Sequence, residues 1–251
     1  MLFMAACSIA LALQLQPGMH IVEHSTFDDH VNWVLPPDKL EGFRRSGVVI
    51  DEDQRTTTVA TTTVTPDLHH LMTLHGSLVK TSTDVPRHRT THTLDDISTT
   101  VTPRNTDVPA SRLDIEDSAM ADLPVGPLCV GQTWRTRLPV MTTLGSGTAT
   151  IDHTIVKTEG SVVEIAIKGE GVISGMEYNL PRLLPGAIGI VGDARFDRAT
   201  GTVTSENYSV RNRLIRTVKG KTIGFLEFES VAITTSVSPA AGSRPVPDPR
   251  R

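Results

Sequence analysis

Apolar and polar side chains alternate with a period of two from Thr148 to Lys168, which is typical of β-strands. Successive side chains on a strand point to opposite faces, so the apolar residues of this stretch share one face. Gly160 lies in the short connection and supplies a residue that tolerates the positive φ of a hairpin turn. The stretch therefore predicts a β-hairpin with one apolar face, which must pack against further structure. The apolar positions are Ile151, Ile155, Val163, Ile165 and Ile167.

The same pattern predicts strands along most of the chain after the N-terminus. Strands are expected over residues 19–24, 54–64, 68–74, 78–84 and 88–101. A hairpin is expected over residues 194–210, turning at 199–201, and another is expected from residues 213–218 and 222–237. A short helix is expected after Asp38 as its capping residue. Residues 176–191 are apolar but contain Pro181 and Pro185, which predicts an excursion or short helix rather than a regular central strand. The expected fold is mainly β: an antiparallel meander of hairpins forming a curved sheet or half-barrel, with one or two short helices.

The pattern divides the chain into two β-rich halves. The expected segments are residues 1–14 (leader), 15–102 (first half), 103–127 (linker), 128–237 (second half) and 238–251 (proline-rich, disordered tail). The sequence around Leu15 is echoed around Leu128, so the halves are either related by duplication or alike by chance. In either case each half alone is thin, and the two are expected to share one core.

Composition supports a β protein and excludes some classes of partner. Thr is abundant, and its branched Cβ favours a pleated surface over a helix. A net charge of −4 and only 4% aromatic residues argue against a nucleic-acid binder. One basic run remains, which is either a solvated strand face around a turn or a contact with an anionic surface or membrane. It comprises Arg211, Arg213, Arg216, Lys219 and Lys221.

The first fifteen residues resemble a signal peptide. They are apolar except for Ser8 and Gln14, too short to span a bilayer, and 10–12 form a small-x-small cleavage pattern. The absence of a preceding basic residue leaves open a buried N-terminal element instead. Cys7 lies in a lipoprotein-like context and is a candidate for lipidation, and Cys129 is then expected to be an unpaired, buried residue. Export to the periplasm or the outside is expected, with anchoring through Cys7 as a variant and a cytoplasmic location if the leader does not function. A transmembrane protein is not expected.

The leader, the successive hairpins and the turn at residues 196–201 together resemble bacterial envelope proteins of the periplasmic lipoprotein-carrier type. The resemblance covers mainly residues 128–237 and lies at the level of the fold. It implies a curved antiparallel sheet around an apolar cavity and binding of acyl chains or another apolar partner. It implies no catalytic residue.

Candidate chemistry is sparse, and no cofactor is expected. Four histidines, His69, His75, His88 and His92, are candidates for zinc ligands or are simply surface imidazoles. The neighbouring carboxylates Asp28-Asp29 and Asp95-Asp96 would face opposite ways on a strand, so they cannot form a glycosidase pair and are expected in turns.

The leading functional hypothesis is an exported, non-enzymatic β protein that binds an apolar small molecule, lipid or envelope component in a concave sheet. The expected lining is Leu183, Leu184, Ile188, Ile190 and Val191, for which plain core packing is the alternative. A second hypothesis is a structural or interaction module of the cell envelope, which contacts a partner protein through an exposed edge strand. A third is a hydrolase with a loop-borne site, for which His153 and the histidine group are the only support.

Overall fold

The computed structural model describes residues 9–12, 14–47, 51–66, 72–101, 120, 123–124, 126–142, 145–175 and 184–239. In these ranges ten antiparallel strands form a single open sheet, accompanied by one helix. The expectation of a mainly β, antiparallel, curved sheet is confirmed. The elements are β1 (His20–Val34), α1 (Pro37–Arg45), β2 (Asp51–Pro66), β3 (Met72–Asp84), β4 (Arg89–Val101), β5 (Thr133–Thr142), β6 (Gly145–Glu159), β7 (Val162–Gly175), β8 (Leu184–Asp197), β9 (Thr202–Val218) and β10 (Lys221–Ser238).

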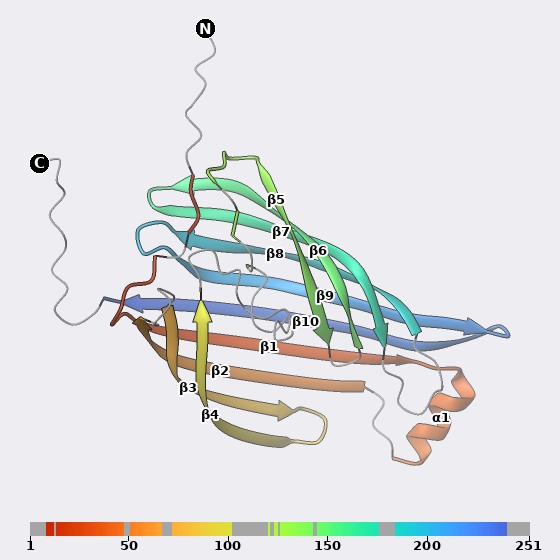
Figure 1. Ribbon diagram of the computed structural model, residues 1–251. Helices are drawn as coiled ribbons and strands as arrows, with labels where there is room; N and C mark the ends of the chain where they lie inside the picture. The colour runs from red at the N-terminus through yellow and green to blue at the C-terminus, as the bar shows by residue number, and fades with distance from the viewer. Residues whose placement is uncertain are drawn as a thin grey trace, which may run out of the picture.

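The first and last strands of the chain meet in the middle of the sheet (Figure 1). The spatial order is β4-β3-β2-β1-β10-β9-β8-β7-β6-β5, so each neighbouring pair is antiparallel and the free edges are β4 and β5. β1 pairs with β10 over its whole length, from His20 opposite Ser238 to Val34 opposite Gly224. The strands of residues 15–102 and of residues 128–237 therefore belong to one sheet, joined by the β1–β10 seam.

The hairpin expected from residues 148–168 is present as β6 and β7. Ile151, Ile155 and Ile165 are fully buried, and Gly160 occupies the turn with φ of 60°. The pairing shifts by one residue at Val156, a β-bulge that turns this valine outward. The period-two pattern thus predicted both the element and the face that it buries.

Several local expectations were wrong, each for a definable reason. Residues 72–84 form one continuous strand, β3, where two strands were expected. Pro185 lies in β8, opposite Ser174, because a proline at the second residue of a strand removes little of the hydrogen-bonded ladder. Asp38 is in the first turn of α1 and not its cap: the helix starts at Pro37, which has a preset φ, and no side chain caps it. The expected Pro181 break lies outside the described residues.

Both carboxylate pairs expected in turns lie inside strands. Asp28 and Asp29 are in the middle of β1, and Asp95 and Asp96 are in β4. Their side chains do alternate in β1, where Asp28 is half-buried and Asp29 is buried. An Asp-Asp pair suggests a turn by composition, but long strand pairing on both sides of β1 overrides this weak local preference.

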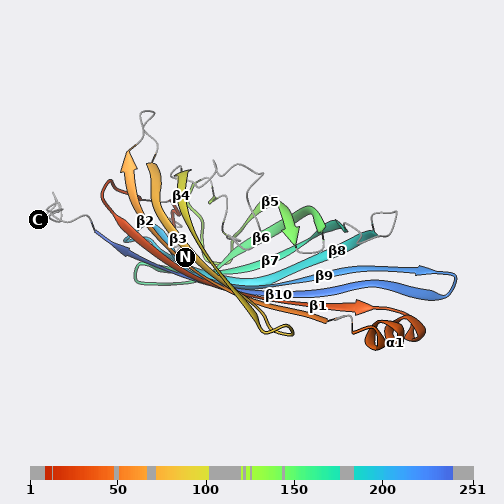
Figure 2. The same ribbon diagram turned by 90° about the horizontal axis from the view of Figure 1, so that it is seen from below.

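The core lies on the concave face of the sheet. Figure 2 shows the sheet as a trough with β1 and β10 along its bottom. One face of β5 to β10, with Phe27 of β1, forms the main cluster, and Leu11, Met120 and Leu123 pack onto it from outside the sheet. Gly169 lies between Ile151 and Ile190 on this face, and an added Cβ would approach their side chains to 3.1 and 3.2 Å. Because glycine has no side chain, the isoleucines of β6 and β8 can pack over β7 at this position.

Across the described ranges, no helix is both long and apolar enough to cross a membrane.

Candidate functional site

The free edge strand β4 is the most exposed strand of the sheet in the described part of the chain, and it is the candidate site. Residues 89–96 are all exposed, and β4 pairs with β3 on one side only. A strand at an edge presents unpaired backbone donors and acceptors to any extended segment that approaches it. β4 can therefore accept a further strand along its outer side.

An apolar row on the convex face leads to this edge. Val59 of β2 lies opposite Val79 of β3, and Val79 lies opposite Leu94 of β4. Their exposed fractions rise toward the edge, from 37% for Val59 through 46% for Val79 to 71% for Leu94. Directly opposed side chains on neighbouring strands touch one another, so the three form a continuous strip. We call this strip the apolar row.

β4 lacks most of the usual protection of an edge strand. It is thirteen residues long, is paired to β3 without a bulge, and contains neither proline nor lysine. Native edges are normally blunted by prolines, lysines and other charges, bulges or short length, and charge is the one of these devices that β4 has. Two adjacent acids, Asp95 and Asp96, are its exposed charges beside Leu94. The outer edge of β4 is thus unpaired. Its convex face carries the apolar side chain of Leu94, and carboxylates lie beside it.

The opposite edge, β5, is protected. It contains Pro139 in its interior, which cannot donate to a further ladder. Arg135 donates two hydrogen bonds to the Asp152 carboxylate, at 2.6 Å from Nε and 3.0 Å from Nη2. The Arg135 hydrogen bond lowers the pKa of Asp152, so this exposed ion pair persists in mildly acidic solution. The contrast between the two edges singles out β4.

The turn that begins β4 is held by a second ion pair. The Arg87 guanidinium donates to the Asp84 carboxylate at 2.6 Å, and the Arg87 amide donates to the same carboxylate at 3.1 Å. The side-chain hydrogen bond from Arg87 is the main cause of the lowered pKa of Asp84. His88 completes this turn with φ of 51°. The β3–β4 hairpin is therefore closed by its own charges, independently of any partner.

The candidate zinc ligands are dispersed. His75 and His92 are both exposed on the convex face, but His75 lies opposite Ser98 and His92 opposite Thr81, about 20 Å apart along the ladder. His92 Nδ1 lies 3.0 Å from Thr81 Oγ1, and His88 is in the turn. His69 lies outside the described residues. The geometry does not bring the three described histidines together.

The expected ligand-lining residues divide between the two faces. Ile188 and Ile190 are buried in the main cluster on the concave face, whereas Val191 is exposed on the convex face. Leu184 is the first residue of β8, and Leu183 lies outside the described residues. The two isoleucines thus belong to the packed core.

The basic run extends along β9 and its turn into β10. Arg211 and Arg213 are exposed on the convex face, and the Arg211 guanidinium lies 5.6 Å from the centre of the Phe228 ring. Lys219 is in the turn, and Lys221 Nζ lies 3.6 Å from Asp38 Oδ2 of α1. The side chain of Arg216 is outside the described set. The described cations are spread over two elements and a turn, and one of them faces an acid.

Two further expectations concern single residues. His153 lies within β6, fully buried and stacked on the Trp134 ring with centroids 4.7 Å apart, so it is not a loop residue. Cys129 is half-buried and disulfide-bonded, which corrects the expectation of an unpaired core residue. The other cysteine of the sequence is Cys7, a candidate for lipidation that lies outside the described residues.

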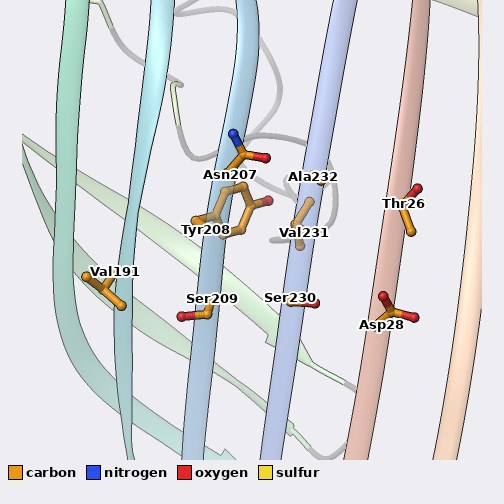
Figure 3. Close-up of a pocket in the computed structure, with 9 residues that line it drawn as sticks. All are labelled: Thr26, Asp28, Val191, Asn207, Tyr208, Ser209, Ser230, Val231 and Ala232. Atoms are coloured by element: carbon orange, nitrogen blue, oxygen red, sulfur yellow. The ribbon is translucent and has the colours of Figure 1, made fainter.

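A shallow open depression crosses β8, β9, β10 and β1 (Figure 3). It exists because the convex positions here are mostly small. Asp28 is its one ionisable carboxylate, and this group accepts two hydrogen bonds from Arg55, at 2.6 and 3.0 Å. The depression therefore offers hydroxyl groups and a paired charge, but no nucleophile beside a base. The lining residues are Thr26, Asp28, Val191, Asn207, Tyr208, Ser209, Ser230, Val231 and Ala232.

One group of functional interest was missed by the sequence pattern. Asp29, Glu227 and Glu229 are buried on the concave face, at the β1–β10 seam. The sequence did contain a signal for this group. Glu227 and Glu229 are an even number of residues from Phe225 and Val231, so β10 carries two acids on the same face as its buried apolar residues.

Comparison with known proteins gives no family. No family model and no curated protein matches the chain. Among solved structures, the matches include the type II secretion system secretin GspD of E. coli K12, with 10% identity, a TM-score of 0.20 and coverage of 88% of this chain. The chain spans about half (49%) of that secretin. GspD of enteropathogenic Escherichia coli matches with 10% identity and a TM-score of 0.19, over 87% of this chain and 67% of that one. A Rh. blastica porin mutant matches with 6% identity and a TM-score of 0.21, over 87% and 100% of the two chains. These two secretins and the porin are too distant to support an inference, and none of the three is a lipoprotein carrier.

Proposed function

We propose that the protein is an exported, non-enzymatic interaction module that binds an extended segment of a partner protein along its free edge strand β4. The observation that carries this is the apolar row ending at Leu94 on a long edge strand without proline, lysine or bulge. Addition of a strand to such an edge satisfies its backbone groups, and side chains on one face provide selectivity.

The chemistry of β4 defines the segment that it would accept. A partner strand places alternate side chains on the convex face, where an apolar residue would cover Leu94. Two residues further along the same face is Asp96, and Asp95 points to the other face. The expected partner segment is extended, apolar at one convex position and basic beside it.

The disulfide of Cys129 supports an extracytoplasmic location, because stable disulfides form in oxidising compartments. An envelope or secreted setting is therefore part of the proposal. Mass spectrometry of the native protein tests it, since a chain with Cys129 as a free thiol in its native compartment would contradict it.

A binding experiment tests the partner chemistry. The probes are two fluorescent ten-residue peptides of alternating Thr and Val with a central Leu, one with Lys and one with Asp two residues from the Leu. The Lys peptide is expected to bind at least about ten-fold more tightly, a difference of about 1.4 kcal/mol, and to slow hydrogen exchange in β4. Leu94→Asp should abolish this binding.

The matched control is Val172→Asp. Val172 is 66% exposed on the convex face of β7, which is paired on both sides, so its replacement should leave peptide binding unchanged. The proposal fails if neither peptide binds up to about 1 mM, where the binding free energy is only about −4 kcal/mol. It fails equally if Val172→Asp weakens binding as much as Leu94→Asp.

A second candidate function is binding of an apolar ligand in the concave sheet. Its one support is the size of the apolar cluster on the concave face, in which Ile188 and Ile190 are buried. Titration with a fluorescent fatty acid tests it: saturable binding that is weakened by Ile190→Asn supports this function, and absence of saturable binding rejects it.

A further inference from the structure

Two arginines and two large apolar side chains form a compact group on the convex face, which we call the convex cluster: Arg211, Arg213, Leu226 and Phe228. Arg211 of β9 lies opposite Phe228 of β10. Arg213 lies opposite Leu226 in the next convex row of the same strand pair. All four side chains are exposed, and Leu226 and Phe228 each have an exposed fraction of 40%. The cluster therefore presents positive charge and apolar surface together to the solvent.

The convex cluster differs from the positions around it. The neighbouring convex pair of β9 and β10 is Ser209 and Ser230, which are both small and polar. Toward β7, Arg213 lies opposite Ala187, and Ala187 lies opposite Val172, which is 66% exposed. Exposed apolar side chains thus lie on both sides of Arg213, whereas single scattered ones would need no explanation.

The two arginines have no acidic partner within the described residues. The Arg211 guanidinium lies 5.6 Å from the centre of the Phe228 ring, and neither arginine forms an ion pair there. The residues directly opposite them on β8 are Gly189 and Ala187, which have no charge. Glu170 of β7 is two strands from Arg211, beyond Gly189. Both positive charges are therefore open to an anion from outside the chain.

An open hollow of about 410 Å³ lies beside Arg213. Ala187, the convex neighbour of this arginine on β8, has only a methyl group, so space remains next to the guanidinium. The hollow gives a polar headgroup room to approach the charge from the side of β8. Its lining is Gly186, Ala187, Arg213, Ile215 and Thr217.

We propose that the convex cluster docks the protein on an anionic lipid membrane surface. Basic side chains are attracted to the phosphates of an anionic leaflet, and apolar side chains beside them enter the boundary between headgroups and acyl chains. The cluster has both components within two adjacent strands. This contact does not involve β4, so it is independent of the proposed binding of an extended segment.

The strands beneath the cluster favour a surface over a peptide as the partner. β9 and β10 are each paired on both sides, so their backbone groups do not accept an additional strand. Figure 2 shows β1 and β10 along the bottom of the trough, and the outside of this bottom is the crest of the convex face. A crest meets a flat bilayer before the edges of the sheet do, whereas a groove is what holds a peptide.

The test is co-sedimentation of the full chain with lipid vesicles. One set contains phosphatidylcholine alone, and the other contains about 30% phosphatidylglycerol, which supplies the negative charge. The anionic vesicles should bind about thirty-fold more tightly, because each arginine near the surface contributes a factor of about five. Added salt should weaken this binding. Equal binding to both sets, or binding to neither, would overturn the proposal.

Charge reversal separates the cluster from net charge. Arg213→Glu should weaken binding to the anionic vesicles about thirty-fold, because it changes the charge at the surface by two. Arg211→Glu should have the same effect and replaces it if Arg213→Glu does not fold. Arg137→Glu is the matched control: Arg137 is exposed on β5, four strands or about 19 Å away, beyond a Debye length of about 8 Å. Its reversal should change binding less than about three-fold, and equal losses would contradict the site.

The apolar component distinguishes a membrane from an acidic protein. Leu226→Ser should weaken binding to the anionic vesicles about three-fold or more, because the exposed part of the leucine no longer leaves water. A soluble poly-glutamate peptide should not displace the chain from the vesicles. Displacement by this peptide, or a Leu226→Ser variant that binds vesicles like the wild type, would overturn the proposal and indicate an acidic protein partner.

Discussion

At the residue scale, burial follows the parity of each position in its strand. Ile165 of β7 is 1% exposed, whereas Val172 of the same strand points to the convex face and is largely exposed. Both are branched apolar residues, so side-chain type alone would place both inside. Parity distinguishes them, and this difference gives a matched pair of substitutions.

Ile165→Ala should lower the free energy of unfolding by about 2–5 kcal/mol, because it removes buried methyl groups and leaves a cavity in the main cluster. Val172→Ala should change it by less than about 0.5 kcal/mol, since the side chain faces water. Chemical denaturation of both variants measures the difference. Equal losses would mean that the two faces of β7 are not distinct.

Asp197 closes the β8–β9 turn. Its carboxylate accepts a 2.9 Å hydrogen bond from the Ala199 amide and one of 3.3 Å from Thr200 Oγ1. A side-chain hydrogen bond from Ser161 is the main cause of its lowered pKa. A lowered pKa means that the ionised form stabilises the fold above the unfolded value of about 3.9, and that this contribution is lost as pH falls through the folded value.

Asp197→Ala should therefore cost about 1 kcal/mol at pH 7, and the gap from the wild type should narrow as the pH falls below about 4. Denaturation curves at several pH values measure it. Asp193→Ala, at an exposed position of β8, is the control and should cost less than about 0.5 kcal/mol. A gap at Asp197 that does not depend on pH would contradict the role of its charge.

At the element scale, a hairpin depends on the backbone conformation of its turn. Whether an edge strand can accept a partner strand depends on the protective residues that it contains. Gly160 adopts φ of 60°, and a Cβ there would meet nothing within 4 Å. Any cost of substitution is therefore conformational. β4 and β5 are alike in being unpaired on one side, but Pro139 and the Arg135–Asp152 pair protect only β5.

Gly160→Ala should destabilise the protein by about 1–2 kcal/mol, because a residue with Cβ pays to adopt positive φ. Gly42→Ala in α1 is the control: its Cβ also meets nothing within 4 Å, and in a helix alanine is favoured. Equilibrium unfolding should show a loss for the first variant and no loss for the second. A loss in both would point to a general intolerance of added methyl groups.

At the scale of the whole molecule, residues distant in sequence close the structure. Leu11, Met120 and Leu123 cover the core of a sheet to which they do not belong as strands. Cys129 precedes β5 and is disulfide-bonded. The bond restricts the unfolded chain and so stabilises the folded one.

Reduction should lower the Tm of the wild type, and Cys129→Ser should lower the free energy of unfolding by about 2–4 kcal/mol. The Cys129→Ser variant should be insensitive to reducing agent, which provides the internal control. Calorimetry with and without reductant measures both effects. A wild-type Tm that does not respond to reductant would contradict a stabilising disulfide.

The sequence by itself determined the class of fold, the β6–β7 hairpin and the buried face of its strands. The alternation of apolar and polar side chains that predicts them is a property of neighbouring residues. It also pointed to the Ala199-Thr200-Gly201 and Lys219-Gly220 turns, where glycines adopt positive φ. It did not determine that β1 lies beside β10, that β4 became the open edge, or that Asp29 meets Glu229. Those depend on which strands pair across some two hundred residues, and the pairing is set by long-range packing and backbone hydrogen bonds that no short window of sequence contains. The buried group of Asp29, Glu227 and Glu229 exists only once that pairing is made.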